Sequence, residues 1–255
     1  MIYSGQGPMY MGDFDLTHGT PAQGYLVNMK KIGCANRTLK FNFKQTTKNI
    51  RETDSGQHLT FATLESGKEA GASLEMVDFD RTMLAMAMYG TTALVPAGTV
   101  TNEAFPTVVA GDVVHTKHPI ISTVVIKDSA ATPVTLTLGT HYTVDSADHG
   151  RINIVDPATL TQPFKIDYDN AAYGNIAAFS ATSVTKGIIF DGINTSDGSK
   201  VRVIVPRIKF SPTKDFDWLG DAEAVLALEG EILYVAELST DNKYGPFFRI
   251  DALAS

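Results

Sequence analysis

Apolar and polar residues alternate with a period of two along much of this chain. The clearest case is Leu39, Phe41 and Phe43, which are separated by lysine and asparagine. This pattern is typical of a strand with one buried and one solvated face. Short segments of strand character also lie at 122–127, 134–138, 142–144, 151–155 and 164–168. We therefore expect a mainly β fold, a β-barrel or a β-sandwich.

The alternation fades after Lys44 into a polar segment, and a strand pattern resumes from His58 to Leu64. Two strands joined in this way predict a long hairpin loop at about 45–60, with its tip near Asp54 to Gly56. The tip carries charges of both signs and is longer than a two-residue turn requires. It is either an interaction element or a mobile surface hairpin.

One stretch combines a short strand, a helix start and an almost uncharged helix. Ser73 to Val77 has strand character, Asp78 is a suitable N-cap, and Gly90 suits the left-handed position that follows a last turn. No charge occurs from Thr82 to Tyr89, so we expect a helix at about 79–89 that is covered on most sides. It lies either in the core of its own domain or between a barrel and a neighbouring subunit. Its main apolar residues are Phe79, Met83, Met86 and Met88.

The chain after this helix is expected to contain a linker and then a group of short strands. Residues 91–102 contain proline and glycine without a strong period, which predicts a linker. The short strands within 103–174 either form an inserted small β domain or complete the barrel. In both cases the main barrel is expected from residues 1–102 and 175–255.

The last strands are more apolar than the earlier ones. Pro206 follows the nearly continuous apolar run from Val201 to Val205 and requires a sheet edge, a bulge or a strand end. From Leu226 to Leu238 one face is apolar and the other carries glutamates, and Gly230 predicts a bend or bulge within it.

Composition narrows the functional classes. With 255 residues, of which 44% are apolar, the chain can bury a full core, and its net charge of −7 argues against a protein that grips a nucleic-acid backbone. Basic residues gather in 1–51 and acidic residues from Asp215 onward. Copies of the chain either stack head to tail through these complementary segments, or both are ordinary solvated surfaces.

Cysteine content and apolar runs fit assembly in a reducing cytoplasm and indicate neither export nor membrane insertion. Cys34 is the only cysteine, so no intramolecular disulfide forms, and we expect it to be a small core residue in a reducing compartment. No apolar run reaches the length of a membrane span, and the N-terminus lacks the pattern of a signal peptide.

Catalytic patterns are missing from the sequence. There is no P-loop, no G-x-S-x-G elbow, no H-E-x-x-H and no cysteine pair for zinc. His115 and His118 are three residues apart, which places them on opposite faces of an extended segment. The oxygen-rich run Asp191 to Gly198 lacks the closing glutamate of an EF-hand and is expected to be a turn. We therefore expect no enzyme activity, no catalytic residues, no cofactor and no metal.

Several motifs appear in a characteristic order. Phe79 to Gly90 reads F-x-x-x-x-L-A-x-A-x-Y-G, Gly139 to Asp145 reads G-x-x-Y-x-V-D, and Gly150 to Ile154 reads G-x-I-x-I. The strand segments that follow these motifs are Phe164 to Tyr168, Ile189 to Asn194, Val201 to Phe210 and Val225 to Leu238. Together they cover most of residues 70 to 240. The series resembles the major tail tube proteins of long-tailed, non-contractile (siphovirus-type) bacteriophages.

This resemblance implies a structural virion protein that forms hexameric rings, which stack into the tube through which phage DNA is ejected. Assembly would take place in the host cytoplasm, with tape measure, tail terminator and baseplate or distal tail proteins as partners and no membrane involved. DNA would pass through the lumen without specific binding.

The resemblance also implies roles for particular residues. The hairpin tip would contact the next ring, and the helix would lie at the subunit boundary. An acidic strand face would line the lumen and keep DNA from adhering, or the same glutamates would be exposed to solvent on the outside. The residues concerned are Lys48, Arg51, Glu52 and Asp54 for ring stacking, Phe79, Met83, Met86 and Met88 for the helix, and Glu229 and Glu231 for the lumen.

A second class of function fits the same strands. A carbohydrate-binding or adhesin-like β-sandwich would use exposed aromatic side chains, for which Tyr142, Tyr168 and Tyr173 are the candidates. Such a module would be a monomer or small oligomer and would tolerate deletion of the hairpin. A third reading, a β-fold hydrolase, has only dispersed carboxylates to support it.

Overall fold

The computed structural model describes residues 4–241 and 243–253. The fold is mainly β, as the alternation predicts, and the chain divides into two compact units. The first unit contains the residues up to Thr91 and those from Ala177 onward, and the second contains Thr92–Ile176. No helix within the described residues is long and apolar enough to cross a bilayer.

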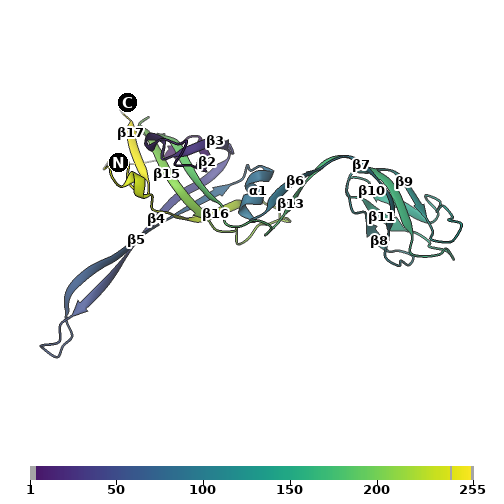
Figure 1. The fold of residues 1–255 in the computed structure, drawn as a ribbon, viewed down its shortest axis with the longest axis horizontal. Coiled ribbons are helices and arrows are strands. Elements are labelled where there is room, and N and C mark those ends of the chain that lie inside the picture. Colours follow the sequence, from purple (N-terminus) through teal and green to yellow (C-terminus); the bar gives the residue numbers. More distant parts are fainter. Residues whose placement is uncertain (1–3, 242, 254–255) are drawn as a thin grey trace. The chain divides into compact units, whose positions relative to one another are not determined.

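The first unit is built on one antiparallel sheet of nine strands (Figure 1). Its strands are β1 (Gly5–Gln6), β2 (Met9–Phe14), β3 (Leu26–Ile32), β4 (Asn36–Arg51), β5 (Thr60–Met76), β14 (Thr185–Asn194), β15 (Lys200–Phe210), β16 (Leu226–Ile232) and β17 (Arg249–Leu253). Seven of them follow the order β3-β2-β14-β15-β16-β5-β4, while β1 pairs with β14 and β17 pairs with β15. Two short 3-10 helices lie at Pro21–Gln23 and Ala236–Leu238.

The sheet curls so that its two ends share one core. Met9 and Ile32 from the β2–β3 end and Leu74 and Leu228 from the β5–β16 end are all at most 3% exposed and belong to the same cluster. A flat sheet would hold these strands apart, because β14 and β15 lie between β2 and β16 in the strand order. The helix α1 (Arg81–Ala87) adds Met86 and other side chains to this core.

The helix is shorter than expected, and its caps differ. Its N-cap is Asp80 rather than Asp78, and the Asp80 side chain accepts a hydrogen bond from the backbone N–H of Met83 at 2.8 Å. The Asp78 carboxylate instead accepts from the backbone N–H of Cys34 at 2.8 Å. The left-handed residue after the helix is Tyr89, with φ of 48°, and not Gly90.

Pro206 lies in a bulge, as its chemistry requires. The pairing of β14 with β15 shifts between Lys186 and Ile188, so that Gly187 faces two residues of β15, one of them Pro206. A Cβ on Gly187 would meet the Pro206 carbonyl oxygen at 2.4 Å. Of the bend or bulge predicted at Gly230, the bulge is wrong, because β16 keeps a regular register with β5. A Cβ at Gly230 would meet the Ile208 side chain at 2.7 Å, so close packing explains this glycine.

The second unit contains two three-stranded sheets that enclose a core of their own. One sheet has the order β7-β12-β9 and the other β10-β11-β8. Their strands are β7 (Gly98–Ala104), β8 (Val113–His115), β9 (Ile121–Lys127), β10 (Tyr142–Ser146), β11 (Arg151–Ile154) and β12 (Lys165–Asn170). Residues 134–138 form only isolated bridges, not the predicted strand. Phe164, Ile126 and Ile152 are fully buried in this core.

The prediction of a linker at 91–102 is wrong, because this segment is largely β structure. It forms β6 (Thr91–Val95) and the start of β7, and β6 pairs with β13 (Tyr173–Ala177) in a two-stranded ribbon. Propensity alone did not reveal these strands, because proline and glycine at 96–98 mark a short break between them and not a long loop.

Three side chains differ from their predicted exposure. Cys34 is exposed rather than in the core. Tyr142 and Tyr168 are buried, at 3% and 1% exposure, because both point into the core of the second unit. Only Tyr173 of the three tyrosines proposed for sugar binding is partly accessible, and its hydroxyl lies 2.9 Å from Nδ1 of His118.

Candidate functional site

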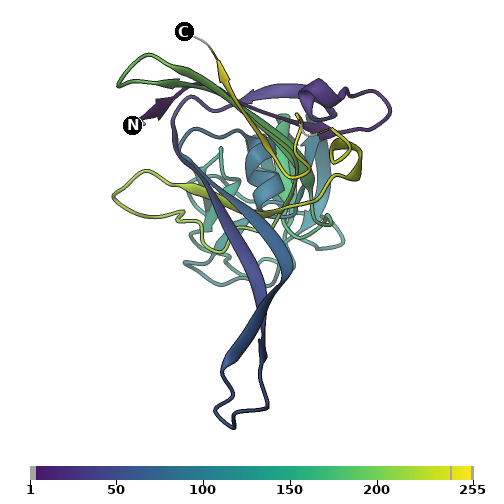
Figure 2. The same ribbon diagram turned by 90° about the vertical axis from the view of Figure 1, so that its left-hand side faces the viewer.

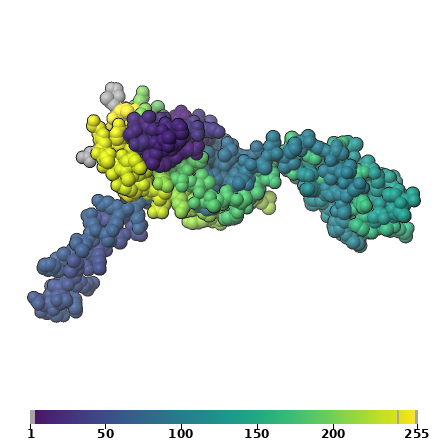
Figure 3. All heavy atoms as spheres, in the orientation of Figure 1, coloured from purple at the N-terminus to yellow at the C-terminus, as the bar shows by residue number. Residues whose placement is uncertain are grey.

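The most prominent surface feature of the first unit is the hairpin of β4 and β5. β16 pairs with β5 only from Ala70 to Met76, so the part of the hairpin beyond Ala70 is a two-stranded ribbon. Figure 2 shows this ribbon extending away from the rest of the curled sheet, and Figure 3 shows it as a separate projection from that unit's surface. An isolated two-stranded ribbon is at best marginally stable in water. The structure therefore maintains an element that its own unit does not cover.

The ribbon exposes apolar side chains that its own unit leaves uncovered. Phe61 is 79% exposed, and three further large apolar side chains of the ribbon and its tip are also exposed: Ile50, Leu59 and Leu64. Phe43, at the base of the hairpin, is exposed too but stacks on Phe248 of the same unit, with 5.2 Å between ring centroids. Lys48 stands opposite Leu64, and Ile50 lies diagonal to Leu64 on the same face of the ribbon. A concentration of exposed apolar groups on one projecting element is a feature of binding surfaces.

The tip of the hairpin is organised by Glu52. Its carboxylate accepts hydrogen bonds from the backbone N–H groups of Asp54 and Ser55, each at 2.9 Å, and from the Ser55 hydroxyl. Its own backbone N–H donates to the Leu59 carbonyl at 2.9 Å. The hydrogen bonds that the carboxylate accepts lower the pKa of the Glu52 carboxyl, and the one from the Ser55 hydroxyl contributes most. Glu52 thus has a folding role in the tip that the sequence did not reveal.

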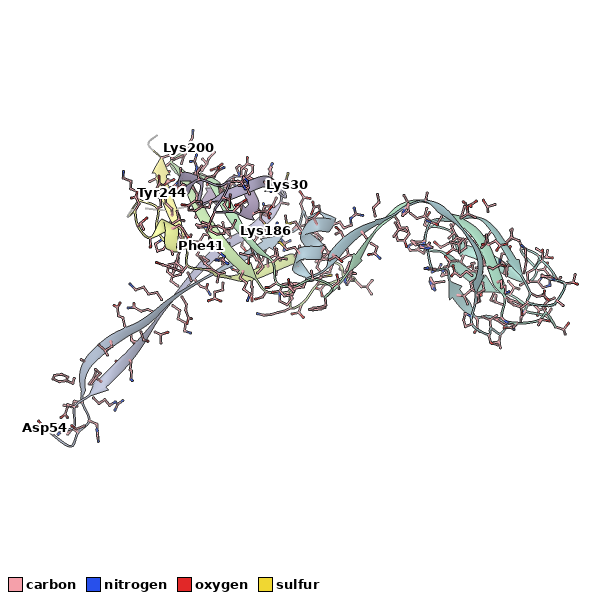
Figure 4. All side chains as sticks on the ribbon, in the orientation of Figure 1. Lys30, Phe41, Asp54, Lys186, Lys200 and Tyr244 are labelled. Atoms are coloured by element: carbon pink, nitrogen blue, oxygen red, sulfur yellow. The ribbon has the colours of Figure 1, made fainter. Side chains whose placement is uncertain are left out.

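The other residues predicted for ring stacking lie free at the end of the ribbon. Asp54 is at the far end of the hairpin, as Figure 4 shows. Lys48 and Arg51 are exposed at the end of β4, and within the described part of the chain none of these three side chains forms an ion pair. They remain available to an external partner.

The apolar residues predicted for α1 are divided between core and surface. Met86 is 7% exposed and belongs to the core. Phe79, Met83 and Met88 are half-buried, and Phe79 makes an edge-to-face contact with Phe216 at 5.7 Å between ring centroids. The helix therefore packs on the core of its own unit, and its half-buried apolar side chains remain partly accessible at the surface.

Glu229 and Glu231 lie exposed on the face of β16 opposite the core, as the alternation predicts. They do not form a purely acidic surface. Glu229 accepts a hydrogen bond from Nζ of Lys214 at 2.7 Å, and Lys209 stands opposite Glu231 in the register of β15 and β16. This face is therefore of mixed charge.

Two long strand edges are unpaired. β3 pairs only with β2 and β4 only with β5, and within residues 4–241 and 243–253 no other backbone segment pairs with their outer edges. Beside the edge of β4 is an open groove of about 1270 Å³. Its walls include Phe41 and Ile250, and Lys31 and Lys40 lie on its rim. Unpaired edges beside an apolar groove are suited to association with another chain.

Sequence reasoning missed the loop between β15 and β16. Trp218 is 74% exposed and Leu219 is 97% exposed, on a segment that also carries Asp217 and Asp221. The loop lacks a period of two, so it gave no strand pattern. The signal that was available is the chain's only tryptophan within an acidic segment, since a tryptophan without a place in a periodic pattern is a candidate for a contact residue.

Metal and acid–base chemistry have little support in the geometry. Within the described residues no group of three or more His, Cys, Asp and Glu side chains is placed to hold a metal ion. The most buried titratable side chain of the second unit is Tyr168, whose hydroxyl donates to Glu103 at 2.6 Å. Burial, and then this hydrogen bond, raise the pKa of Tyr168, which stabilises its neutral form. This contact therefore has a structural role.

The structure defines a mainly β protein of two compact units, with a projecting hairpin and unpaired sheet edges. The chain belongs to the family described as "Protein of unknown function UCP028589", whose family model matches residues 2–251. A comparison with curated proteins found no match to the chain.

Proposed function

We propose that this protein is a structural subunit of the tail tube of a long-tailed, non-contractile bacteriophage, present in the virion and assembled in the host cytoplasm. Copies would form rings, hexameric by resemblance to that family, and the rings would stack into the conduit for DNA. Tape measure, tail terminator and baseplate or distal tail proteins would bind the tube at its ends or inside it.

The observation that carries the proposal is the uncovered hairpin. Its ribbon beyond Ala70 has both faces exposed, with apolar residues such as Phe61 and free charges such as Arg51 at its end. A monomer gains nothing from maintaining this element, whereas a stacked ring would bury it against the next ring. The hairpin thus supports an interface along the axis of a tube.

The unpaired edges of β3 and β4 support a second contact, within a ring. The unpaired backbone groups of a sheet edge can form hydrogen bonds with a strand of another chain. In a closed ring, every such edge would be paired with a neighbouring subunit. The mixed-charge face with Glu229, Glu231 and neighbouring lysines would then line the lumen. Such a face offers DNA no continuous basic track, which suits passage without binding.

The carbohydrate-binding alternative is weakened, because two of its three candidate tyrosines are not exposed. Tyr142 and Tyr168 are buried, so they are not available to stack on a sugar. The groove beside β4 is bordered by lysines and apolar side chains rather than by an exposed aromatic platform. No observation of the described residues favours a sugar over a protein partner.

The first test is negative-stain electron microscopy of the purified protein across a concentration series, with size-exclusion profiles. We expect rings or hollow tubes of uniform width. The variant Arg51→Glu reverses a free charge near the hairpin tip, so we expect it to shorten or abolish tubes while leaving the thermal unfolding midpoint unchanged.

The matched control is Lys117→Glu, which makes the same charge change at an exposed position in the second unit. It should leave tube formation unaltered. Tubes of normal length from the Arg51→Glu protein would remove the hairpin tip from the stacking interface. A monomer at every concentration that also binds a glycan array would contradict the proposal itself.

A further inference from the structure

We propose that the loop between β15 and β16 is a plug that enters the groove beside β4 on a second copy of this chain. The plug consists of residues 211–225, with Trp218 and Leu219 as its apolar tip. This contact rests on the proposed self-assembly, and it is distinct from the hairpin and from strand pairing.

The plug is held in a conformation that exposes its tip. Phe216 packs edge-to-face on Phe79 at 5.7 Å and on Trp218 at 4.8 Å. On the other side of the tip, the Glu223 carboxylate forms an ion pair with Arg37. The loop is therefore anchored on both sides, while Trp218 and Leu219 are 74% and 97% exposed (Figure 2, yellow-green loop before β16). An exposed indole is a typical anchor for an interface.

The groove has the complementary chemistry. Apolar side chains of β4, β14, β15 and β17 line it, including Leu39, Phe190 and Val203. All of the charged side chains among its described lining residues are basic, namely Lys31, Arg37 and Lys40. Arg37 is paired with Glu223 of the same chain, so Lys31 and Lys40 supply the positive charge for a partner. An apolar cavity with a positive rim suits an apolar tip flanked by carboxylates.

The plug supplies those carboxylates. Asp217 directly precedes Trp218, and Asp221 follows Leu219 by two residues. Neither forms an ion pair within the described part of the chain, and the same holds for Lys40 on the groove rim. Docking would give each of these charges a partner of opposite sign.

Two other occupants fit less well. The hairpin tip carries Lys48, Arg51, Glu52 and Asp54, whose charges cancel, so it has no electrostatic preference for a basic rim. The plug of the same chain is held by its two anchors with its tip in solvent rather than buried in the chain's own groove. A second copy is therefore the occupant that the charges and the exposure favour.

The first experiment is a charge exchange followed by sedimentation velocity. Lys31→Glu with Lys40→Glu reverses the groove rim, and Asp217→Lys with Asp221→Lys reverses the plug. We expect each pair alone to weaken self-association by roughly tenfold or more, because like charges then face each other. The four substitutions combined in one chain should restore association. Unchanged association in both pairs, or no restoration in the combined variant, would overturn the proposal.

The second experiment uses Cys34, the native cysteine in the groove lining. Leu219→Cys should form disulfide-linked dimers and larger species on mild oxidation. The matched controls are Leu219→Cys in a Cys34→Ser background, and Leu138→Cys at an exposed leucine of the second unit; neither should yield them. An internally linked monomer would assign the plug to its own groove, and cross-linking of Cys34 to Phe61→Cys instead would assign the groove to the hairpin. Both results would overturn the proposal.

The same samples separate this contact from the proposed function. Normal rings or tubes without a link between residues 34 and 219 would refute the plug and leave the tube proposal standing. A link between residues 34 and 219 in a protein that never forms rings or tubes would support the plug and count against the tube.

Discussion

At the scale of single residues, the hairpin tip depends on one carboxylate. Glu52 joins the two ends of the turn, since it accepts from Asp54 and Ser55 while its backbone N–H bonds the Leu59 carbonyl. The hydrogen bonds that the carboxylate accepts, first of all from the Ser55 hydroxyl, favour its charged form, so the folded-state pKa lies below the ordinary value of 4.5. Stabilisation of the tip is therefore present above that value and is lost as the pH falls through the lowered pKa.

We expect the amide resonances of Asp54 and Ser55 to move together in an NMR titration, with a midpoint below 4.5, as Glu52 is protonated. Glu52→Gln should remove this transition, because the amide does not titrate, and it should broaden or shift both signals at neutral pH. If the amide chemical shifts of Asp54 and Ser55 do not change on acidification, the assigned role is contradicted. The result matters for assembly, because a loosened tip presents Arg51 less rigidly.

At the scale of elements, α1 is a two-turn helix that relies on its N-cap. Isolated short helices are unstable, so a helix of seven residues depends on its cap and its packing. Asp80→Ala removes the acceptor for the Met83 N–H and should lower the free energy of unfolding by about 1 kcal/mol. Asp80→Asn keeps a capping oxygen and should cost less. Equal losses in chemical denaturation of the two variants would mean that charge, rather than capping, supports this helix.

The elements also show how far the sequence could predict this fold. Alternation found β4 and β16, and the bulge at Pro206 is one of the three outcomes that the proline allowed, because these features depend on local chemistry. The cap was placed two residues early, since Asp78 and Asp80 are equally good N-caps in sequence and only the Cys34 amide decides that Asp78 is used elsewhere. Long-range contacts of this kind leave no local pattern.

The candidate surface was predictable to a similar extent. The outward position of Glu229 follows from periodicity, and the hairpin was expected from strand patterns on either side of a polar segment. The loop predicted at 45–60 is wrong in its bounds, because β4 continues to Arg51 and β5 begins at Thr60. The lysines beside Glu229 and Glu231 do not, because Lys214 and Lys209 meet these acids through a loop and a strand pairing. The anchored Trp218 was missed for the same reason: Phe79 lies far from it in sequence.

At the scale of the whole molecule, each unit has its own core. The buried core residues of the second unit all lie between Phe105 and Tyr168. We therefore expect residues 92–176, produced alone, to fold into a β protein with dispersed NMR signals and a single cooperative melting transition. Ile166→Asn places an amide at a fully buried position and should abolish that transition, which provides the control. A broad, non-cooperative melt of the unaltered fragment would mean that the second unit needs the first in order to fold.

The ribbon of β6 and β13 connects these two units through paired strands. Neighbouring strands lie about 5 Å apart, so the chain leaves the first unit and returns to it at nearly the same place. A foreign domain whose termini are close together could replace the residues between Val95 and Tyr173 without distorting the first unit. If the protein assembles as proposed, every ring would display one copy of that cargo per subunit, and the ribbon would serve as an attachment point for ordered arrays.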